Sequence, residues 1–394
     1  MFTLRLKKRE ERRVQNGHGW IFSNEIDTTQ TPLKGLDPGS PVTLETANGK
    51  FLAHAYVNPH SLIAARVTSR RANEPFNATV LRARLQQALN LREYRYPDPY
   101  YRLVYSEGDF LPGLIVDRYG DVLVVQITTA GMELYRDDIV DALQSLTSAT
   151  AIFLRNDAPV RELEHLPAYR EWAVGDAVET LQVRENGLDF QVPAELGQKT
   201  GWFYDHRDSR AALAPWVKDR KVLDVYSYLG GFGLNAASLG AASVLAVDAS
   251  QPAIDCALAN AQLNGLADRF ATRCDDAVEA MRTLFEEGER FDVVVLDPPA
   301  FIKRRKDREH GLRHYALNNR LAMRLLNPGG ILVSASCSQA LSHEDLLQQI
   351  RLGMPRSALG LQVLAPLQQG ADHPVHVAMS ETLYLSGAVC RVLS

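Results

Sequence analysis

Three carboxylates and one thiol occupy the positions in this sequence that are best suited to chemistry. Asp224, Asp248, Asp297 and Cys337 each stand at or shortly after the end of a short apolar segment in the C-terminal half of the chain. Short apolar segments that alternate with helical patterns are typical of strands in a buried parallel sheet. Because the carboxyl ends of such strands meet at one edge, where these folds bind ligands, we expect the four side chains to lie together.

The segment around Asp224 indicates which ligand this edge binds. The apolar run 222–225 leads into a turn with several glycines at 230–233, which let the backbone approach a ligand closely. The pattern G-G-F-G does not match the G-x-G-x-x-G fingerprint of dinucleotide sites, and Asp224 would repel a phosphate. A carboxylate suits the ammonium and sulfonium groups of S-adenosylmethionine, and Asp248 is placed to accept ribose hydroxyls. The alternative is an ordinary strand-helix-strand unit whose glycines only form turns.

Asp297 and Cys337 follow two neighbouring expected strands. Asp297 ends the strand 291–296, and two prolines then stiffen the turn, because proline fixes φ and has no N–H to donate. A simple stop of the strand is the other interpretation. The strand 331–335 brings Cys337 to the same edge. A cysteine by itself is more often a small buried apolar residue, but its place beside Asp297 favours a functional thiol.

Composition limits the class of protein. A chain of 394 residues, 46% of them hydrophobic, can form two or three domains, and a net charge of −4 neither requires nor excludes a nucleic acid partner. The four cysteines lack metal-ligand or disulfide spacing, so we expect no metal and a reducing compartment, with Cys256, Cys274 and Cys390 in the core. No apolar run follows the basic N-terminus and none is long enough to span a bilayer, so we expect a cytoplasmic protein.

Residues 1–72 are expected to form a β-rich module. Strand-like runs separated by turn signals occur at 4–6, 41–44 and 62–67. The basic residues Lys7, Lys8 and Arg9 precede Trp20, which we expect to be exposed. Cations beside an exposed ring are typical of a surface that binds RNA phosphates and bases. A solvated, charged face is the alternative.

Residues 73–192 predict a linker helix followed by a central α/β domain. The expected elements are a helix over 81–95, a hairpin around 119–121, a helix over 133–146, a strand over 151–154 and a hairpin closed by Asn186-Gly187. No chemistry stands out in this part of the sequence. Its expected task is to shape the substrate cleft.

Residues 193–394 alternate strand and helix, which predicts a Rossmann-like domain with a doubly wound, mostly parallel sheet. Beyond Asp248 the expected elements are helix 250–263, strand 270–274, helix 277–286, strand 291–296, helix 313–326 and strand 330–336. The loop after the strand 291–296 contains the basic residues Lys303, Arg304 and Arg305. Loops at this edge hold substrates, so RNA contact and plain solvent exposure are equally good interpretations.

The ordered motifs of the chain resemble those of one family. They are GHGWIFSNEI near the start, EGDFLPGLIVDRYG at 107–120, GQKTGWFYDHRDSR at 197–210, DVYSYLGGFG, LDPPAF and SCS. The chain is similar over essentially its whole length to the 23S ribosomal RNA cytosine-C5 methyltransferases, which have an N-terminal PUA-like domain, a central α/β domain and a Rossmann-like methyltransferase domain. It departs from that family at Gly19, where proline is usual.

The resemblance implies a site and a substrate. Cys337 would be the nucleophile, and Asp297 would lie next to the transferred methyl group. The positions that would bind S-adenosylmethionine are Gln198, Arg207, Asp224, Tyr226, Ser227, Gly230, Gly231, Asp248, Asp276 and Asp297. The substrate would be large-subunit ribosomal RNA, and a homodimer is common among similar proteins. Since the LDPPAF motif contains no cysteine, a second thiol would not release the product.

Cytosine chemistry requires such residues. C5 is a poor nucleophile, and addition of a thiolate to C6 makes it enamine-like and able to accept a methyl group. The target base must also leave the stack to be reached.

Two other functions stay open at this point. Amine methylation of an RNA base usually uses Asp-Pro-Pro followed directly by an aromatic residue, whereas Ala300 precedes Phe301 here. A non-catalytic RNA-binding assembly factor is the other function, although it would have no use for the full set of Asp224, Asp248, Asp297 and Cys337.

Overall fold

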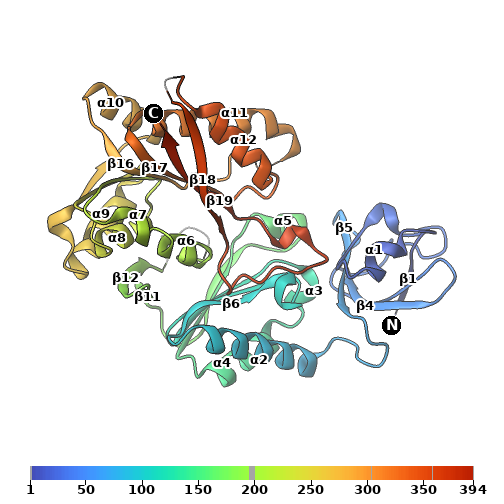
Figure 1. Cartoon of the computed structure of the whole chain (residues 1–394). Helices are drawn as coiled ribbons and strands as arrows, with labels where there is room; N and C mark the ends of the chain where they lie inside the picture. The colour runs from blue at the N-terminus through green and yellow to red at the C-terminus, as the bar shows by residue number, and fades with distance from the viewer. Residues whose placement is uncertain (1, 195–199, 303, 357, 394) are drawn as a thin grey trace. The chain divides into compact units, whose positions relative to one another are not determined.

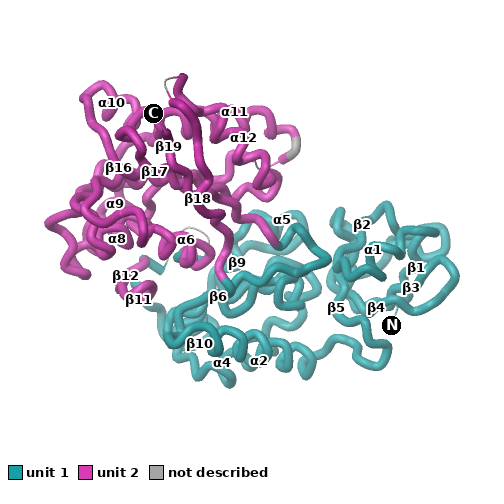
Figure 2. The backbone as a smooth tube through the Cα atoms, in the orientation of Figure 1, with its two compact units in different colours: residues 1–181, 193–202, 371–382 teal, residues 182–192, 203–370, 383–394 magenta. Residues whose placement is uncertain are grey.

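The computed structural model describes the chain except for residues 1, 195–199, 303, 357 and 394 and the side chain of Arg305. The chain forms two compact units, which Figure 2 shows in different colours. The first comprises Met1–Leu181, Pro193–Trp202 and Ala371–Thr382, and the second comprises Gln182–Val192, Phe203–Gly370 and Leu383–Ser394. The domain boundaries expected from the sequence, 1–72, 73–192 and 193–394, stay predictions.

The first unit begins with the expected β-rich module. Its elements are β1 (Phe2–Arg5), α1 (Glu11–Gln15), β2 (Trp20–Phe22), η1 (Ser23–Glu25), β3 (Pro41–Glu45), β4 (Phe51–Val57) and β5 (Ile63–Ser69). The sheet has the order β1-β3-β4-β5-β2, with β1 parallel to β3 and the other pairs antiparallel. Burial alternates along β3, so that Val42 and Leu44 face the core, as the two-residue period of a strand requires.

A second five-stranded sheet, in the order β10-β9-β8-β7-β6, completes the first unit. Its elements are α2 (Ala78–Arg95), β6 (Tyr100–Tyr105), η2 (Ser106–Asp109), β7 (Leu114–Tyr119), β8 (Val122–Ile127), α3 (Ala130–Glu133), α4 (Arg136–Thr147), β9 (Ala151–Asn156), α5 (Val160–Leu163) and β10 (Tyr169–Val174). Helices α2 and α4 lie side by side (Figure 1). The hairpin at 119–121 is confirmed, whereas the helix expected over 133–146 is interrupted at Leu134 and Tyr135.

The second unit contains the doubly wound sheet, in the order β15-β14-β13-β16-β17-β19-β18. The first five strands are parallel, and β19 is antiparallel to both of its neighbours. The strands are β13 (Lys221–Val225), β14 (Ser243–Asp248), β15 (Phe270–Cys274), β16 (Phe291–Leu296), β17 (Leu326–Ser336), β18 (Gly360–Gln368) and β19 (Ser386–Leu393). The longer helices are α8 (Gly231–Ser238), α9 (Gln251–Leu263), α10 (Ala277–Glu286), α11 (Arg308–Arg324) and α12 (His343–Gly353).

Short elements complete the description. They are the hairpin β11 (Thr180–Glu185) and β12 (Leu188–Pro193), η3 (Tyr204–His206), α6 (Arg207–Ala211), α7 (Ala214–Val217), η4 (Ala267–Arg269), η5 (Arg305–Asp307) and η6 (Ser380–Thr382). Asn186 and Gly187 close the hairpin with positive φ angles of 52° and 79°, as the Asn-Gly signal predicts.

Three of the elements expected beyond Asp248 have the predicted bounds, whereas β17 begins at Leu326 rather than at 330 and α11 ends at Arg324 rather than at 326. The strands at 270–274 and 291–296 and the helix at 277–286 are confirmed at both ends. Helix α11 begins at Arg308 rather than at 313. Its first turn is charged and shows no apolar period, which is the signal that sequence reasoning uses.

The register of the sheet determines which residues meet at its carboxyl edge. The row of paired residues at this edge is Val247, Val225, Leu296 and Ser334. Asp248, Tyr226 and Asp297 are the residues that follow directly in their own strands or turns, and Cys337 follows β17. The sheet therefore brings Asp248, Asp297 and Cys337 to the same edge, as the sequence predicts. Asp224, the fourth predicted position, lies one residue before Val225, the edge residue of β13.

Candidate active site

Asp224 lies near the end of β13 and is fully buried. Its Oδ2 accepts a hydrogen bond of 2.8 Å from the N–H of Gly233. Its Oδ1 has no partner among the described residues. Burial raises the pKa of Asp224 to about 7, although the Gly233 N–H opposes the change. An orphaned, buried carboxylate oxygen is unfavourable unless a donor reaches it, so this atom fits an ammonium group.

The turn after β13 keeps the space beside Asp224 open. Gly230 has a φ of +83°, which residues with side chains rarely adopt. A Cβ atom at Gly233 would lie 2.9 Å from the Phe270 ring and 3.1 Å from Asp224 Oδ2. Ser227 is buried, and its Oγ has no partner within the described ranges. Two orphaned oxygens beside a bare backbone fit the amino acid part of S-adenosylmethionine.

Asp248 is oriented by the backbone on both sides. Its Oδ2 accepts the N–H of Tyr228 at 2.9 Å, and its Oδ1 accepts the N–H of Ser250 at 2.9 Å. Each carboxylate oxygen can accept a further hydrogen bond, so Asp248 can receive the two hydroxyls of a ribose. Tyr226, at a φ of 67°, donates its hydroxyl to Asn318 Oδ1 at 2.8 Å, and burial raises the pKa of this tyrosine.

Asp276 and Gly231 both lie at the start of a helix. Asp276 is the N-cap of α10, where its Oδ1 accepts the N–H groups of Val278 and Glu279 at 2.9 and 3.2 Å. Helix capping by itself accounts for an aspartate at this position. Gly231 is the first residue of α8 and is buried. A role of either residue in cofactor binding stays a prediction.

Asp297 forms an ion pair that the individual site predictions did not include. Its Oδ1 lies 3.1 Å from Nε2 of His206, which is buried. Burial lowers the pKa of His206, but the carboxylates of Asp297 and Asp205 raise it by more, so its pKa is above the ordinary value. His206 therefore holds the carboxylate of Asp297 in position through this ion pair.

Cys337 lies between two serines that share one partner. The hydroxyl of Tyr315, on α11, is 2.7 Å from Ser336 Oγ and 2.8 Å from Ser338 Oγ. Ser338 also donates its N–H to Ser336 Oγ at 3.1 Å. Tyr315 is buried, whereas Cys337 is half-buried. The backbone on both sides of the thiol is thus held while the thiol can still be reached.

Sequence reasoning missed the side chains that contact Asp297 and the serines on both sides of Cys337. His206 belongs to the stretch GQKTGWFYDHRDSR, whose histidine between acids was the available signal. Tyr315 lies in a polar helix, and nothing in its local pattern points to Ser336 and Ser338. Its role follows only from the packing of α11 against the sheet.

Gln198 and Arg207 are the two remaining residues that were predicted to bind the cofactor. Gln198 lies outside the described residues. Arg207 is buried, its Nε is 3.4 Å from Glu185 Oε2, and its guanidinium lies over the ring of Tyr204. Glu185 also pairs with Arg210. Arg207 thus belongs to an internal ion-pair cluster of the second unit.

Among the residues of the first module predicted to contact RNA, the three basic residues are exposed and the tryptophan is not fully exposed. Lys7, Lys8 and Arg9 are exposed, and Lys7 donates to the Asn24 carbonyl at 2.7 Å. The prediction that Trp20 is exposed was wrong. It is half-buried, because its Nε1 donates to Glu107 at 2.7 Å.

In the basic loop, Arg304 is exposed. Lys303 and the side chain of Arg305 lie outside the described part of the chain.

The expectation that Cys256, Cys274 and Cys390 are all in the core was wrong for two of them. Cys390 is buried, but Cys256 is half-buried and Cys274 is exposed, because β15 is the edge strand of its sheet.

No helix in the described ranges combines the length and the apolar character that a membrane span needs.

Known proteins with similar sequences agree with the site chemistry. Residues 4–70 match the family described as PUA-like domain, and residues 111–375 match the S-adenosylmethionine-dependent methyltransferases. The chain is 37% identical over 394 residues to ribosomal RNA large subunit methyltransferase I of Cronobacter sakazakii, with 98% of each chain covered. It is 36% identical over 395 residues to the protein of that name from Salmonella arizonae, covering 98% of this chain and 97% of the relative.

Solved structures share the fold over the full length. A SAM-dependent methyltransferase from Streptococcus mutans matches with a TM-score of 0.84 and 22% identity, and both chains are covered completely. A methyltransferase solved in complex with SAH matches with a TM-score of 0.85 and 22% identity, again with complete coverage of both chains.

Proposed function

We propose that this chain transfers a methyl group to C5 of a cytosine in 23S ribosomal RNA. The chain belongs to the S-adenosylmethionine-dependent methyltransferases and, among them, to the family of ribosomal RNA large subunit methyltransferase I. The observation that carries the proposal is the position of Cys337. It follows the strand next to that of Asp297, at the edge where Asp224 and Asp248 lie.

The cofactor would be held by side chains on the β13 and β14 side of the edge. Asp224 Oδ1 and Ser227 Oγ are the orphaned oxygens for its amino acid part, and Asp248 would accept its ribose hydroxyls. When bound, S-adenosylmethionine supplies a methyl group on a sulfonium. Asp276, Gly230 and Gly231 would complete the site.

Cys337 would activate the cytosine by covalent addition. Its thiolate forms an S–C6 bond, and the electron pair of the C5–C6 double bond makes C5 nucleophilic. C5 would gain the methyl group as the S–CH3 bond of the sulfonium breaks, with its electron pair staying on sulfur as the thioether leaves. C5 would then lose its hydrogen as a proton, and the electrons of that C–H bond would restore the C5–C6 double bond. The S–C6 bond breaks with its electron pair returning to Cys337.

Asp297 would bind the polar edge of the base. His206, whose Nε2 lies 3.1 Å from Asp297 Oδ1, would hold the carboxylate in place. A base that is bound in this way must be unstacked from its neighbours. Asp297 or a water molecule would then take the C5 proton.

The test compares the wild type with Cys337→Ala and, as a matched control, Cys274→Ala, an exposed cysteine at the end of β15. Protein-free 23S ribosomal RNA is incubated with labelled S-adenosylmethionine and digested for nucleoside mass spectrometry. We expect 5-methylcytidine from the wild type and Cys274→Ala and none from Cys337→Ala. Full activity of Cys337→Ala, or label in an N-methylated nucleoside, would contradict the covalent route.

The same proposal includes the cellular setting. With ribosomal RNA as substrate and without cysteine spacing for disulfides, the protein would act in the cytoplasm. A homodimer and the domain boundaries 1–72, 73–192 and 193–394 stay predictions.

A further inference from the structure

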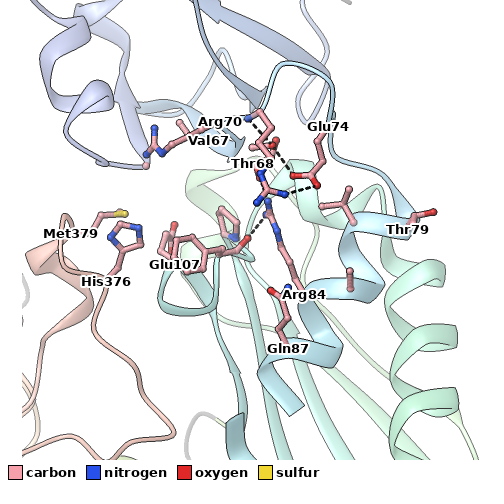
Figure 3. Close-up of a pocket in the computed structure, with 17 residues that line it drawn as sticks. Val67, Thr68, Arg70, Glu74, Thr79, Arg84, Gln87, Glu107, His376 and Met379 are labelled. Carbon is pink, nitrogen blue, oxygen red and sulfur yellow. Dashed lines mark hydrogen bonds and ion pairs between the residues drawn. The ribbon is translucent and has the colours of Figure 1, made fainter. Parts of the chain in front are cut away.

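The first unit contains a cavity of about 470 Å³ that has no part in the methyl transfer chemistry above. Its walls come from β5, from the first turns of α2, from the segment 107–112 and from the segment 376–379 (Figure 3). All of these belong to the first compact unit. Two of the stretches that carry the family resemblance, GHGWIFSNEI and EGDFLPGLIVDRYG, contribute Gly19 and Glu107 to this wall.

The charges on the wall do not balance. Arg70, Arg71 and Arg84 line the cavity together with Glu74 and Glu107. Glu74 pairs with Arg71 at 3.2 Å. Glu107 pairs at 3.2 Å with Arg66, which lies behind the wall and also contacts Glu164. The two acids on the cavity wall thus form ion pairs with Arg71 and Arg66. Arg70 and Arg84 line the cavity without an ion pair among the described residues.

Arg70 and Arg84 are held in place by neutral partners. Arg70 donates to the carbonyl oxygens of Val14 and Gly17 at 2.9 and 2.6 Å. Arg84 donates to the carbonyls of Phe110, at 2.6 Å, and Thr68. Neither guanidinium has a carboxylate partner in the described part of the chain. Burial lowers the pKa of Arg84, and Glu74 offsets this only in part, so an anion near it would be stabilising.

An exposed aromatic ring stands at the same cavity. Phe110 is 59% exposed and has a φ of 59°, a conformation that bulky residues rarely adopt. Its ring meets His376 edge to face, with the centroids 5.0 Å apart. Strained backbone that presents a large apolar side chain to solvent points to a binding role. An aromatic ring with this exposure suits a flat partner.

We infer that this cavity binds one unstacked nucleotide of the RNA substrate, with its phosphate on Arg70 and Arg84 and its base against Phe110. The volume falls within the roughly 300–1,000 Å³ of small-ligand sites. Cations for phosphate combined with an aromatic platform for a base are how proteins bind single-stranded nucleic acid. The identity of the ligand as RNA rests on the proposed function, and the site itself is additional to it.

The experiment measures binding of labelled, protein-free 23S ribosomal RNA by filter retention at several salt concentrations. We expect Arg84→Gln and Arg70→Gln each to raise Kd about fivefold and to lower the slope of log K against log salt by about one. Phe110→Ala should raise Kd roughly tenfold and leave that slope unchanged, because stacking releases no counterions. Arg82→Gln, an exposed arginine of α2 outside the cavity, is the matched control.

Folding and function are checked separately. Thermal melting and S-adenosylmethionine binding should match the wild type in every variant, and Arg84→Lys, which keeps the charge, should recover part of the RNA affinity. If Arg70→Gln, Arg84→Gln and Phe110→Ala all bind RNA as Arg82→Gln does, the inference is wrong. Tighter binding of free AMP than of RNA would also overturn it. If the variants lose RNA affinity but the wild type makes no 5-methylcytidine, the site stands and the proposed function fails.

Discussion

The two halves of the carboxyl edge hold their functional side chains in different ways. In the half formed by β13, β14 and β15, Asp224, Asp248 and Asp276 accept hydrogen bonds from backbone N–H groups. The donors are those of Gly233 for Asp224, Tyr228 and Ser250 for Asp248, and Val278 and Glu279 for Asp276. In the half formed by β16 and β17, Asp297 and Cys337 depend on side chains from elsewhere in the chain. His206 contacts Asp297, and Tyr315 contacts the serines on both sides of Cys337.

In the proposed function, this difference separates residues that bind the cofactor from residues that take part in the reaction. Backbone donors do not change when side chains are replaced, so the acids of the first half keep their orientation through most substitutions. The supports of the second half can be removed one at a time. Substitution in the first half should therefore weaken cofactor binding, and substitution of a support in the second half should lower kcat at unchanged cofactor affinity.

The largest effect is expected for Asp224→Asn. The substitution keeps an oxygen that can accept the Gly233 N–H but removes the charge that, in the proposed function, would face the ammonium group. Because a hydrogen bond to a charged group contributes about 1.5–3 kcal/mol, we expect the Kd of S-adenosylmethionine to rise up to about 100-fold. Isothermal titration calorimetry at pH 7.5 measures it. Asp276→Asn, at a helix cap, serves as the comparison and should weaken binding far less.

The raised pKa of Asp224 predicts the direction in which the affinity for S-adenosylmethionine changes with pH. Its pKa is about 7 in the free protein because the group is buried, and a cationic ligand binds the ionised form. Below pH 7, S-adenosylmethionine affinity should fall by about tenfold per pH unit, and Asp224→Asn should lack this slope. Since the folded pKa is above that of an unfolded carboxyl, stability of the free protein decreases as pH rises towards 7. A flat wild-type profile would show that Asp224 does not face the charge.

His206→Gln should act on the reaction instead. Glutamine can still donate to Asp297 but carries no charge, so the carboxylate loses its ionic partner. We expect kcat to fall roughly 30-fold, corresponding to about 2 kcal/mol for a charged hydrogen bond, with the Kd of S-adenosylmethionine unchanged. The pKa of His206 is raised, so the wild-type kcat should decline as pH rises through that pKa, and the variant should not show this decline. His60→Gln, an exposed histidine of the first unit, is the control.

The same difference explains how far the sequence can predict this molecule. The strand-ending acids and the glycine-rich turn are local features, and the sheet brings Asp224, Asp248 and Asp297 to one edge as expected. The supports of Asp297 and Cys337 are side chains of other elements, which no local pattern marks. Tyr315 is 21 residues from Ser336 in the sequence, and its helix shows no pattern that marks the contact. Trp20 was misjudged for the same reason, because its partner, Glu107, is 87 residues away.

The smallest effect, and the sharpest test of the separation, is expected for Tyr315→Phe. The ring still packs against Phe301, with the two ring centroids 4.9 Å apart, while Ser336 and Ser338 lose the hydroxyl that both contact. Ser338 keeps its own hydrogen bond to Ser336, so the strand end is loosened rather than released. We expect kcat to fall about fivefold, corresponding to about 1 kcal/mol for one hydrogen bond.

The Kd of S-adenosylmethionine and the KM for RNA should stay within about twofold of the wild type, because Tyr315→Phe moves only the thiol. Tyr94→Phe, a 91% exposed tyrosine, controls for the loss of a hydroxyl. If Tyr315→Phe weakened cofactor binding as much as it lowered kcat, the β17 end could not be displaced without disturbing β13. The edge would then be one rigid unit, and the separation of binding from reaction would not hold.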